Sequence, residues 1–296
     1  MFKLYSRLKA VKAKMKGVNK DIYGCIAQKV LVARQNLEAV QMRLMQKHGE
    51  VGLRTSEQEC LHQFISVQKA EEAFMKQKAR NKLLTLGDHN SRFFHYQVKA
   101  RQARNAIKCL IDSESNRLDS PDQIKTEVIS FYQHLLGISN AVNEGDMMNI
   151  VSTLMENSIL DADKDLLVRD VFEIEIKNTM FTLGSVKAPG PDGFTACFFK
   201  KAWPIVRSDV CSAVKSFFHS SSLLKEVNST IITLVPKVPN PSSITEFRPI
   251  ACCNVLYKCI TKILANRFRS CLSDLISSNQ TAFVKGRIIS ENILLA

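Results

Sequence analysis

The feature that most constrains this fold is a long apolar stripe near the start of the sequence. Between residues 19 and 48, apolar side chains recur at alternating steps of four and three: Ile26, Val30, Ala33, Leu37, Val40 and Leu44. An α-helix places residues with this spacing on one face. The stripe therefore predicts one long helix over residues 19–48 that buries this face against another element.

A second helix is expected directly after the first. Gly49 and Gly52 interrupt the stripe, and Ser56 with Glu59 three positions later predicts a capping box at the next helix start. Two long helices with a short connection pack as an antiparallel hairpin. Such a hairpin favours a packing or spacing role over chemistry.

The charge of the chain narrows the classes of partner. Lys and Arg number 41 against 28 Asp and Glu, so the formal net charge is +13 over 296 residues. This excess favours a polyanion, with RNA or DNA first and an anionic membrane surface second. A basic surface that binds nothing is the alternative that composition leaves open.

Two further patterns bear on the compartment. No window reaches the roughly 18 consecutive apolar residues of a membrane span, which weakens the membrane interpretation. The nine cysteines form no C-x-x-C pair and no signal peptide is recognisable, so reduced thiols are expected. We therefore expect an intracellular protein, in the nucleus or the cytoplasm, with no membrane partner.

A basic segment follows the predicted hairpin. Between residues 76 and 108, nine Lys and Arg residues accompany the single acid Asp88, with aromatic residues among them. Phosphates and exposed bases suit this mixture, although aromatics in a core and charges on a solvated helix face explain it as well. The candidate nucleic-acid contacts are Arg92, Phe93, Phe94, Arg101 and Arg104.

The remaining elements are expected from local signals. Ser120, Pro121 and Gln123 predict a helix start, and Gly137 predicts its end. A helix is also expected before Gly184, and one or two more are expected over residues 195–222, with a break near residues 203–204. β-branched residues predict a strand over residues 229–237 and a return arm over residues 244–253, followed by an amphipathic helix over residues 255–276.

Several kinds of site are excluded. The segment GSVKAPGPDG lacks the Gly-Lys step of a phosphate-binding loop, and DADKDLLVRDVF lacks the glycine and glutamate of a calcium loop, so its acids indicate a helix start. The histidines and cysteines show no zinc spacing. Two-metal phosphoryl transfer needs converging carboxylates, and the sequence contains no adjacent pair of aspartates.

Positive groups around the predicted β-hairpin remain. Lys237 ends the first arm and Arg248 begins the second, so antiparallel pairing would bring both side chains to one region. An ammonium and a guanidinium there suit phosphate oxygens. Two solvated surface charges are the alternative.

The motif KAPGPDGF, residues 187–194, contains two prolines and two glycines. These residues fix a bend that either lets a basic residue and the following helix meet a nucleic-acid groove or simply connects two helices.

The order of three blocks resembles the reverse transcriptase of plant LINE-type non-LTR retrotransposons. The blocks are KAPGPDGF, then ITLVPKVPNPSSITEFRPIACCNVLYKCITKILANRF, then SNQTAFVKGRIISENILLA. Residues 71–107 also resemble the segment between endonuclease and polymerase in that family. The resemblance covers nearly the whole chain.

This resemblance implies an α+β, mostly α fold in three parts. These are a helical hairpin linker (residues 1–86), a basic helical extension (87–170) and an incomplete fingers region with a small antiparallel β element (171–296). It implies that Lys237 and Arg248 approach the triphosphate of an incoming dNTP. Template or substrate contacts are implied for Lys187, Asp192, Gln280 and Arg287, and a shaping role for Pro191, Gly193, Phe283 and Gly286.

The resemblance also implies what this chain lacks. The family's palm carries the aspartates that bind two magnesium ions, and neither aspartate block occurs here. We therefore expect a truncated RNA-directed DNA polymerase with no catalytic or metal-binding residue and no cofactor of its own, inactive alone. RNA, DNA and dNTP are the expected partners, and uncovered fingers surface predicts self-association. A non-catalytic nucleic-acid-binding protein is the alternative.

Overall fold

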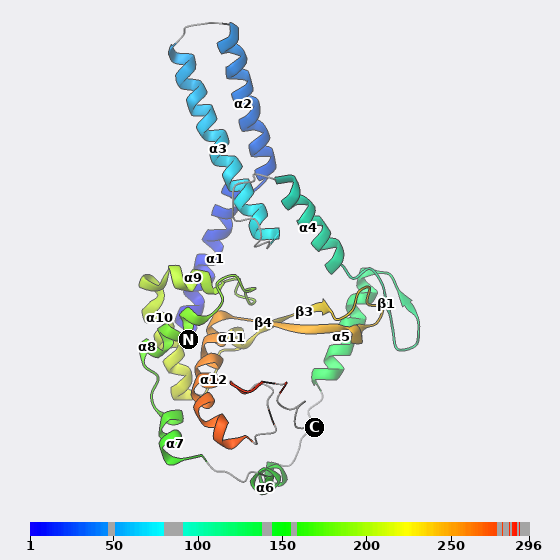
Figure 1. The fold of residues 1–296 in the computed structure, drawn as a ribbon, viewed down its shortest axis with the longest axis vertical. Coiled ribbons are helices and arrows are strands. Elements are labelled where there is room, and N and C mark those ends of the chain that lie inside the picture. Colours follow the sequence, from blue (N-terminus) through cyan, green and yellow to red (C-terminus); the bar gives the residue numbers. More distant parts are fainter. Residues whose placement is uncertain are drawn as a thin grey trace. The chain divides into compact units, whose positions relative to one another are not determined.

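The computed structural model describes residues 1–46, 51–79, 91–137, 144–154 and 159–276, together with residues 280, 284, 286–288 and 290. Within these residues the chain is mostly helical, with two small two-stranded sheets (Figure 1). The predicted α+β, mostly α fold class is confirmed. No helix in the described part has the length and apolarity needed to cross a membrane.

The chain forms two compact units. The first contains Met1–Ala10 and Ile111–Ala296, and the second contains Val11–Leu110. Helix α1 (Phe2–Tyr23) contributes residues to both. The predicted boundaries at residues 86/87 and 170/171 stay predictions.

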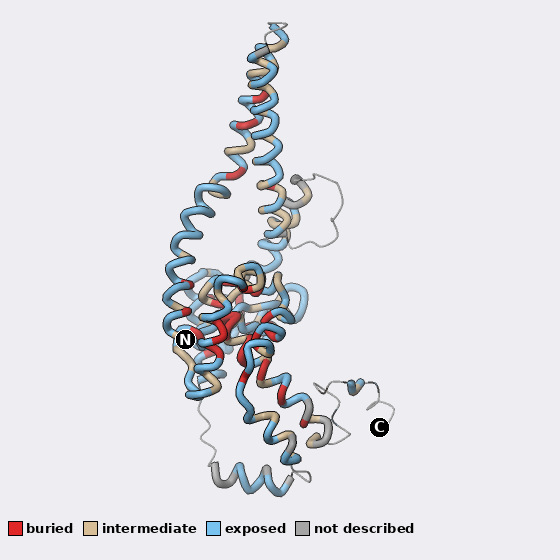
Figure 2. The backbone as a smooth tube through the Cα atoms, turned by 90° about the vertical axis from the view of Figure 1, so that its left-hand side faces the viewer, coloured by how far each residue is buried: buried red, intermediate tan, exposed pale blue. Residues whose placement is uncertain are grey.

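The second unit is built on the predicted antiparallel hairpin of α2 (Ile26–Gln46) and α3 (Val51–Ala79). The stripe residues Ile26, Ala33 and Leu37 are buried, whereas most of the hairpin surface is exposed (Figure 2). The Gln41 amide donates to the Glu57 carboxylate over 3.0 Å between the two helices. The hairpin prediction is confirmed.

Two boundaries of the hairpin prediction were wrong. The expected helix over residues 19–48 is two helices, because the backbone breaks at Gly24 and Cys25, where Cys25 has a left-handed φ of 52°. The predicted capping box lies inside α3, where the Ser56 hydroxyl donates to the Gly52 carbonyl over 3.1 Å. Mid-helix serines commonly bond back in this way, so the capping signal was misread. Gly49 lies outside the described residues.

The next elements lead from the second unit into the first. Helix α4 (Ser91–Asn105) precedes a short hairpin of β1 (Leu110–Ile111) and β2 (Arg117–Leu118), which no sequence pattern predicted. The Asp112 carboxylate accepts the N–H groups of Glu114 and Asn116, and bonding to Asn116 lowers the pKa of that carboxyl. Helix α5 (Pro121–Gly137) has the predicted bounds, and α6 (Glu144–Leu154) follows.

The core of the first unit lies among helices. These are α7 (Asp161–Val168), α8 (Glu173–Thr182), α9 (Ala196–Lys201), α10 (Trp203–Ser220), α11 (Lys225–Asn228) and α12 (Val255–Leu275). Ile176, Phe199, Val214, Ile260 and Ile263 are buried in one cluster, which Leu4 and Leu8 of α1 join. The predicted break between the two helices around residues 203–204 is confirmed at Ala202.

One charged side chain lies inside this unit. Arg267 of α12 is 4% exposed and its guanidinium forms a two-pronged pair with the Glu175 carboxylate, both contacts at 3.0 Å. The same guanidinium donates to the carbonyls of Leu167, Arg169 and Asp170. Arg267 therefore ties α12 to α8 and to the end of α7.

A β-ribbon projects beside the helices. Strands β3 (Thr230–Pro236) and β4 (Phe247–Cys253) pair antiparallel, with Thr230 opposite Cys253 and Pro236 opposite Phe247. This confirms the predicted strand and its return arm. β4 leads through Asn254 directly into α12, so the ribbon is fixed to a core helix.

Candidate nucleic-acid interface

The two cations at the ribbon tip lie on one face of the ribbon. Val235 pairs with Arg248, and the Lys237 N–H donates to the Glu246 carbonyl over 2.7 Å. Paired residues share a face, as do residues two apart along a strand, so Lys237 and Arg248 are diagonal neighbours. Both residues are exposed.

The loop that joins the strands is held by a short capped turn. The 3₁₀ helix Ile244–Glu246 has a capping box in which the Ser243 hydroxyl accepts the Thr245 N–H at 3.2 Å. The Glu246 carboxylate accepts the Ser242 N–H at 2.6 Å and the Ser243 N–H at 3.3 Å, and these bonds lower its pKa. The Lys237 ammonium donates to the Thr245 carbonyl over 2.6 Å, which positions it at this turn.

Residues at the ribbon tip are packed against the rest of the unit, whereas side chains in the middle of the ribbon are exposed to solvent. Ile244 and Phe247 are buried, and the Ile111 N–H donates to the Ser242 carbonyl over 2.8 Å. Between the tip and the base, Ile231 is 50% exposed and Ile250 is 45% exposed. The ribbon thus presents apolar side chains beside two cations, a combination that suits a partner with both phosphates and rings.

The KAPGPDGF bend is packed against the corner between β4 and α12. Its Gly193 N–H donates to the Gly190 carbonyl over 3.0 Å, with Pro191 and Asp192 at the central turn positions. A Cβ on Gly190 would lie 2.4 Å from the Asn254 backbone nitrogen, so only glycine permits this approach. The Asn254 side chain accepts the Asp192 N–H and donates to the carbonyls of Glu226 and Val227.

Asp192 itself has a local partner. Its carboxylate accepts the Phe194 N–H over 3.0 Å, and the Phe194 ring is buried. The described contacts of the bend are those of a connector, which was the second of the two interpretations offered by the sequence. A template or substrate contact of Asp192 stays a prediction.

The other predicted contacts of the first unit are separated along the chain. Lys187, the first residue of the KAPGPDGF segment, is exposed. The Arg287 guanidinium donates to the carbonyl of Gln280 over 2.8 Å and to that of Ile276 over 3.0 Å, so it braces the backbone after α12. Gly286 beside it has a left-handed φ of 91°. Phe283 lies outside the described residues.

The predicted contacts of the basic segment lie on α4 in the second unit. Arg101 and Arg104 are exposed, Phe93 is half-buried, and Tyr96 is 69% exposed. The side chains of Arg92 and Phe94 lie outside the described part of the chain. The exposed arginines and tyrosine fit the nucleic-acid interpretation, while Phe93 fits the packing alternative.

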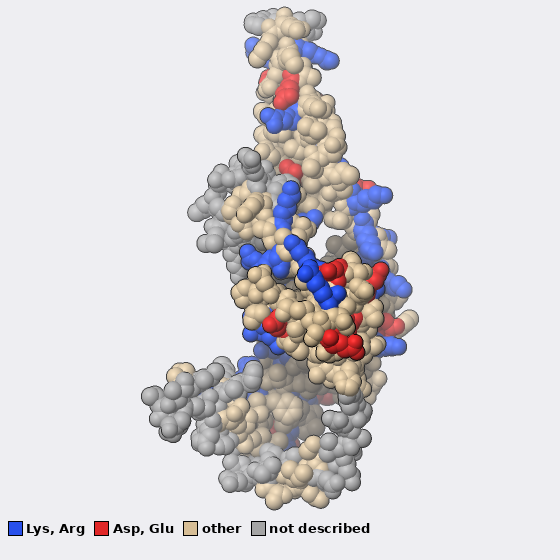
Figure 3. All heavy atoms as spheres, turned by 90° about the vertical axis from the view of Figure 1, so that its right-hand side faces the viewer, with Lys and Arg blue, Asp and Glu red and all other residues tan. Residues whose placement is uncertain are grey.

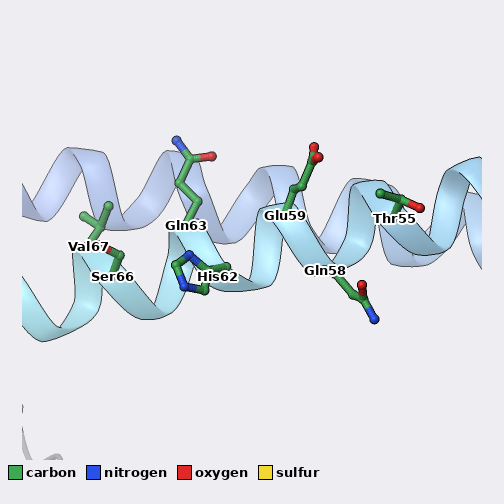
Figure 4. Close-up of a pocket in the computed structure, with 7 residues that line it drawn as sticks. All are labelled: Thr55, Gln58, Glu59, His62, Gln63, Ser66 and Val67. Atoms are coloured by element: carbon green, nitrogen blue, oxygen red, sulfur yellow. The ribbon is translucent and has the colours of Figure 1, made fainter.

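Basic side chains do not gather into one patch on the face drawn in Figure 3. Lys and Arg stand there among Asp and Glu. Figure 4 shows a shallow depression whose seven lining residues, from Thr55 to Val67, all belong to α3. Because one helix supplies every lining side chain, this depression is a surface stripe and has no enclosed site.

Two groups of residues were not singled out from the sequence. Asn254 organises the bend, and its only signal was the position of an asparagine directly before a helix. Lys258 and Lys262 lie on α12 beside Lys187 around one cavity. Their four-residue spacing in an amphipathic helix was visible, but nothing in the sequence connected them to residue 187.

Comparison with known proteins links the chain to transposons. No known protein-family profile matches it. Over 232 residues, or 77% of the chain, it is 28% identical to the transposon TX1 uncharacterized 149 kDa protein of Xenopus laevis. The chain spans 17% of the length of that relative. The similarity supports a transposon-related protein.

Proposed function

We propose that this chain is part of a retrotransposon RNA-directed DNA polymerase of the LINE type. In this proposal the β3–β4 ribbon belongs to the fingers, and Lys237 and Arg248 bind the triphosphate of a dNTP. The observation that carries it is the shared face of these two exposed cations at a braced ribbon tip. The similarity to a transposon protein and the ordered motifs support the assignment.

We further propose that the chain does not polymerise by itself. Phosphoryl transfer by two metal ions needs converging carboxylates. Among the described residues, no three His, Cys, Asp or Glu side chains form a group that could hold a metal ion. The described residues therefore do not fit a magnesium site, and the proposed role of this chain is to position phosphates. Extension of a primed RNA template by the purified chain, abolished by a chelator, would contradict this part.

The binding proposal is tested with single-site variants of the ribbon tip. Fluorescence polarisation of a labelled dNTP is measured for the wild type, Lys237→Met and Arg248→Met. Each variant is expected to weaken binding about tenfold, because each removes one charge-assisted phosphate contact. Lys201→Met, which removes an exposed charge from α9, serves as the matched control. Equal affinity of both tip variants and this control would refute the assignment.

A second candidate function is non-catalytic RNA or DNA binding through α4. The exposed Arg101, Arg104 and Tyr96 favour it. A labelled single-stranded RNA is titrated at increasing salt, where phosphate-driven affinity falls linearly on a double-logarithmic plot. If Arg101→Met with Arg104→Met flattens this plot and the ribbon variants leave it unchanged, the second function is favoured. Absence of RNA and dNTP binding at low salt would remove both.

A further inference from the structure

A cavity of about 480 Å³ lies between α12 and residues 183–188, the turn that leads from α8 into the KAPGPDGF segment. Its apolar lining includes Leu183, Ala188, Ala196, Val255 and Ala265. Its cationic lining consists of Lys187, Lys258 and Lys262, and no lining residue is an Asp or Glu. The cavity thus combines an apolar wall with positively charged ammonium groups.

The lysines reach the cavity from separate elements. Lys258 and Lys262 lie one turn apart on α12 and are half-buried, and Lys187 comes from the turn. The Lys258 ammonium donates to the Ala188 carbonyl over 3.1 Å. Behind the turn, the Lys200 ammonium donates to the Leu183 carbonyl over 2.5 Å and to the Ser185 hydroxyl. The ammonium groups of Lys258 and Lys200 therefore bond to residues 183–188, and Lys187 and Lys262 add two more lysines to the cavity lining.

No acid neutralises this group within the described structure. The described ion pairs involve other residues, and the recorded bonds of Lys200 and Lys258 go to neutral oxygens. Partly buried ammonium groups of like charge repel one another, and an anion placed between them removes that repulsion. A phosphate supplies several acceptor oxygens for lysines arriving from different directions.

The apolar lining of the cavity favours an anionic ligand that also carries an apolar ring. A free phosphate would leave the partly buried Leu183 and Ala188 and the exposed Ala265 uncovered, whereas a nucleotide base would cover them. Cavities of roughly 300–1,000 Å³ hold small organic ligands, so the volume fits one nucleotide. The ligand chemistry that matches the whole cavity is a nucleoside phosphate.

We propose that this cavity binds one nucleotide, with its phosphate on Lys187, Lys258 and Lys262 and its base against the apolar wall. The nucleotide is either free or part of a single strand. This inference rests on the proposed nucleic-acid function but uses residues separate from the ribbon tip. It adds Lys258 and Lys262 to the predicted contact of Lys187.

Two kinds of variant test the cavity in the full chain. Lys258→Met with Lys262→Met removes two charges, and Ala265→Phe fills the apolar side without changing charge. Lys201→Met with Arg269→Met is the control, because both residues are exposed and lie outside the lining. Polarisation is measured with a fluorescent ADP and with labelled 15-nucleotide RNA and DNA single strands.

Both cavity variants are expected to weaken nucleotide or strand binding at least tenfold, and the control less than about threefold. For strands, the lysine variant should also lower the salt slope by about one, because the two lysines contact the same phosphate. If the cavity variants lose binding of ADP, the ligand is a free nucleotide. If they lose binding of the strands alone, the ligand is a nucleotide within a strand. Loss in the lysine variant without loss in Ala265→Phe would refute the cavity, since only general charge would then matter.

Other outcomes separate this inference from the proposed function. If the wild type binds and the ribbon-tip variants weaken binding while both cavity variants behave as the control, the cavity inference fails alone. If the wild type binds neither ADP nor strands, the cavity inference fails; if it does not bind the labelled dNTP either, the proposed function fails with it. Binding to vesicles of anionic lipid, lost in both cavity variants and without nucleotide binding, would replace the nucleotide with a lipid headgroup and overturn the inference.

Discussion

Removing Arg267 should destabilise the first unit more than removing any exposed arginine of the same helix. The side chain of Arg267 is 4% exposed and that of Glu175 is 18% exposed, so little water reaches the pair. Arg267→Ala leaves the carboxylate without its partner and three carbonyls of residues 167–170 without this donor. Breaking a buried pair in this way costs about 3–5 kcal/mol.

This cost converts into a measurable shift in melting temperature. For a unit of this size, each 1 kcal/mol lowers Tm by about 2–4 °C, so the cost of about 3–5 kcal/mol should lower the Tm of Arg267→Ala by about 6–20 °C. Trp203 is the single tryptophan of the chain and is buried in the first unit, so its fluorescence reports unfolding of that unit alone. Urea titrations followed by this fluorescence give the free energy of unfolding directly.

Two companion variants identify the cause. Arg269→Ala, at an exposed position of α12, should change the free energy of unfolding by less than about 0.5 kcal/mol. Arg267→Met with Glu175→Met removes both charges and should recover about 1–3 kcal/mol relative to Arg267→Ala, because no charge is left buried. If Arg267→Ala costs no more than Arg269→Ala, the role assigned to this pair is wrong.

Three further predictions concern the bend, the thiols and the ribbon turn. Gly190→Ala should lower the free energy of unfolding in urea by about 1–3 kcal/mol, because its Cβ would meet the Asn254 backbone at 2.4 Å. Gly137→Ala serves as the control, since a Cβ there has nothing within 4 Å. Equal losses of stability in the two variants would contradict the close approach. Burial raises the pKa of Cys259 to about 12 from 9.0, so the folded state keeps its proton above pH 9 while the unfolded state loses it, and stability should fall as pH rises from 9 towards 12. At pH 8, iodoacetamide should therefore label the exposed Cys25 well before Cys259, as mass spectrometry of peptides would show, and early labelling of Cys259 would exclude its burial. Hydrogen bonds from Ser242 and Ser243 lower the pKa of Glu246, so the ionised carboxylate stabilises the folded state above pH 4.5, and this contribution is lost as pH falls through the folded pKa. The free energies of unfolding of the wild type and Glu246→Gln should therefore converge in acid. A constant difference between them down to pH 2 would refute this account.

The sequence predicted those elements whose signals agree with one another. The helix over residues 121–137 has a start signal and a terminal glycine, and the structure reproduces its bounds. The strand pair was equally clear, since β-branched residues flank a loop rich in proline and serine. Short-range sequence signals are enough to predict such elements.

The remaining features depend on tertiary contacts that no local signal reports. The break at Cys25 needs a left-handed residue that is not glycine, and the β1–β2 hairpin is too short to show a period. Arg267 resembles a surface charge in the sequence, and its burial follows only from the packing of α12 against α7 and α8. The lysine cavity combines segments about 70 residues apart, so its charge became visible only in the folded chain.

Hydrogen exchange in the exposed middle of the β3–β4 ribbon can report whether a ligand is bound there. Strands that are fixed at both ends and uncovered between them open at a lower free energy than core helices. Amide protons of Ile231 and Ile250 should therefore exchange with deuterium before those of Ile260 and Ile263, which are buried. Any ligand that settles on the strands slows this exchange, so isotope uptake at these amides would reveal binding without a label on either partner.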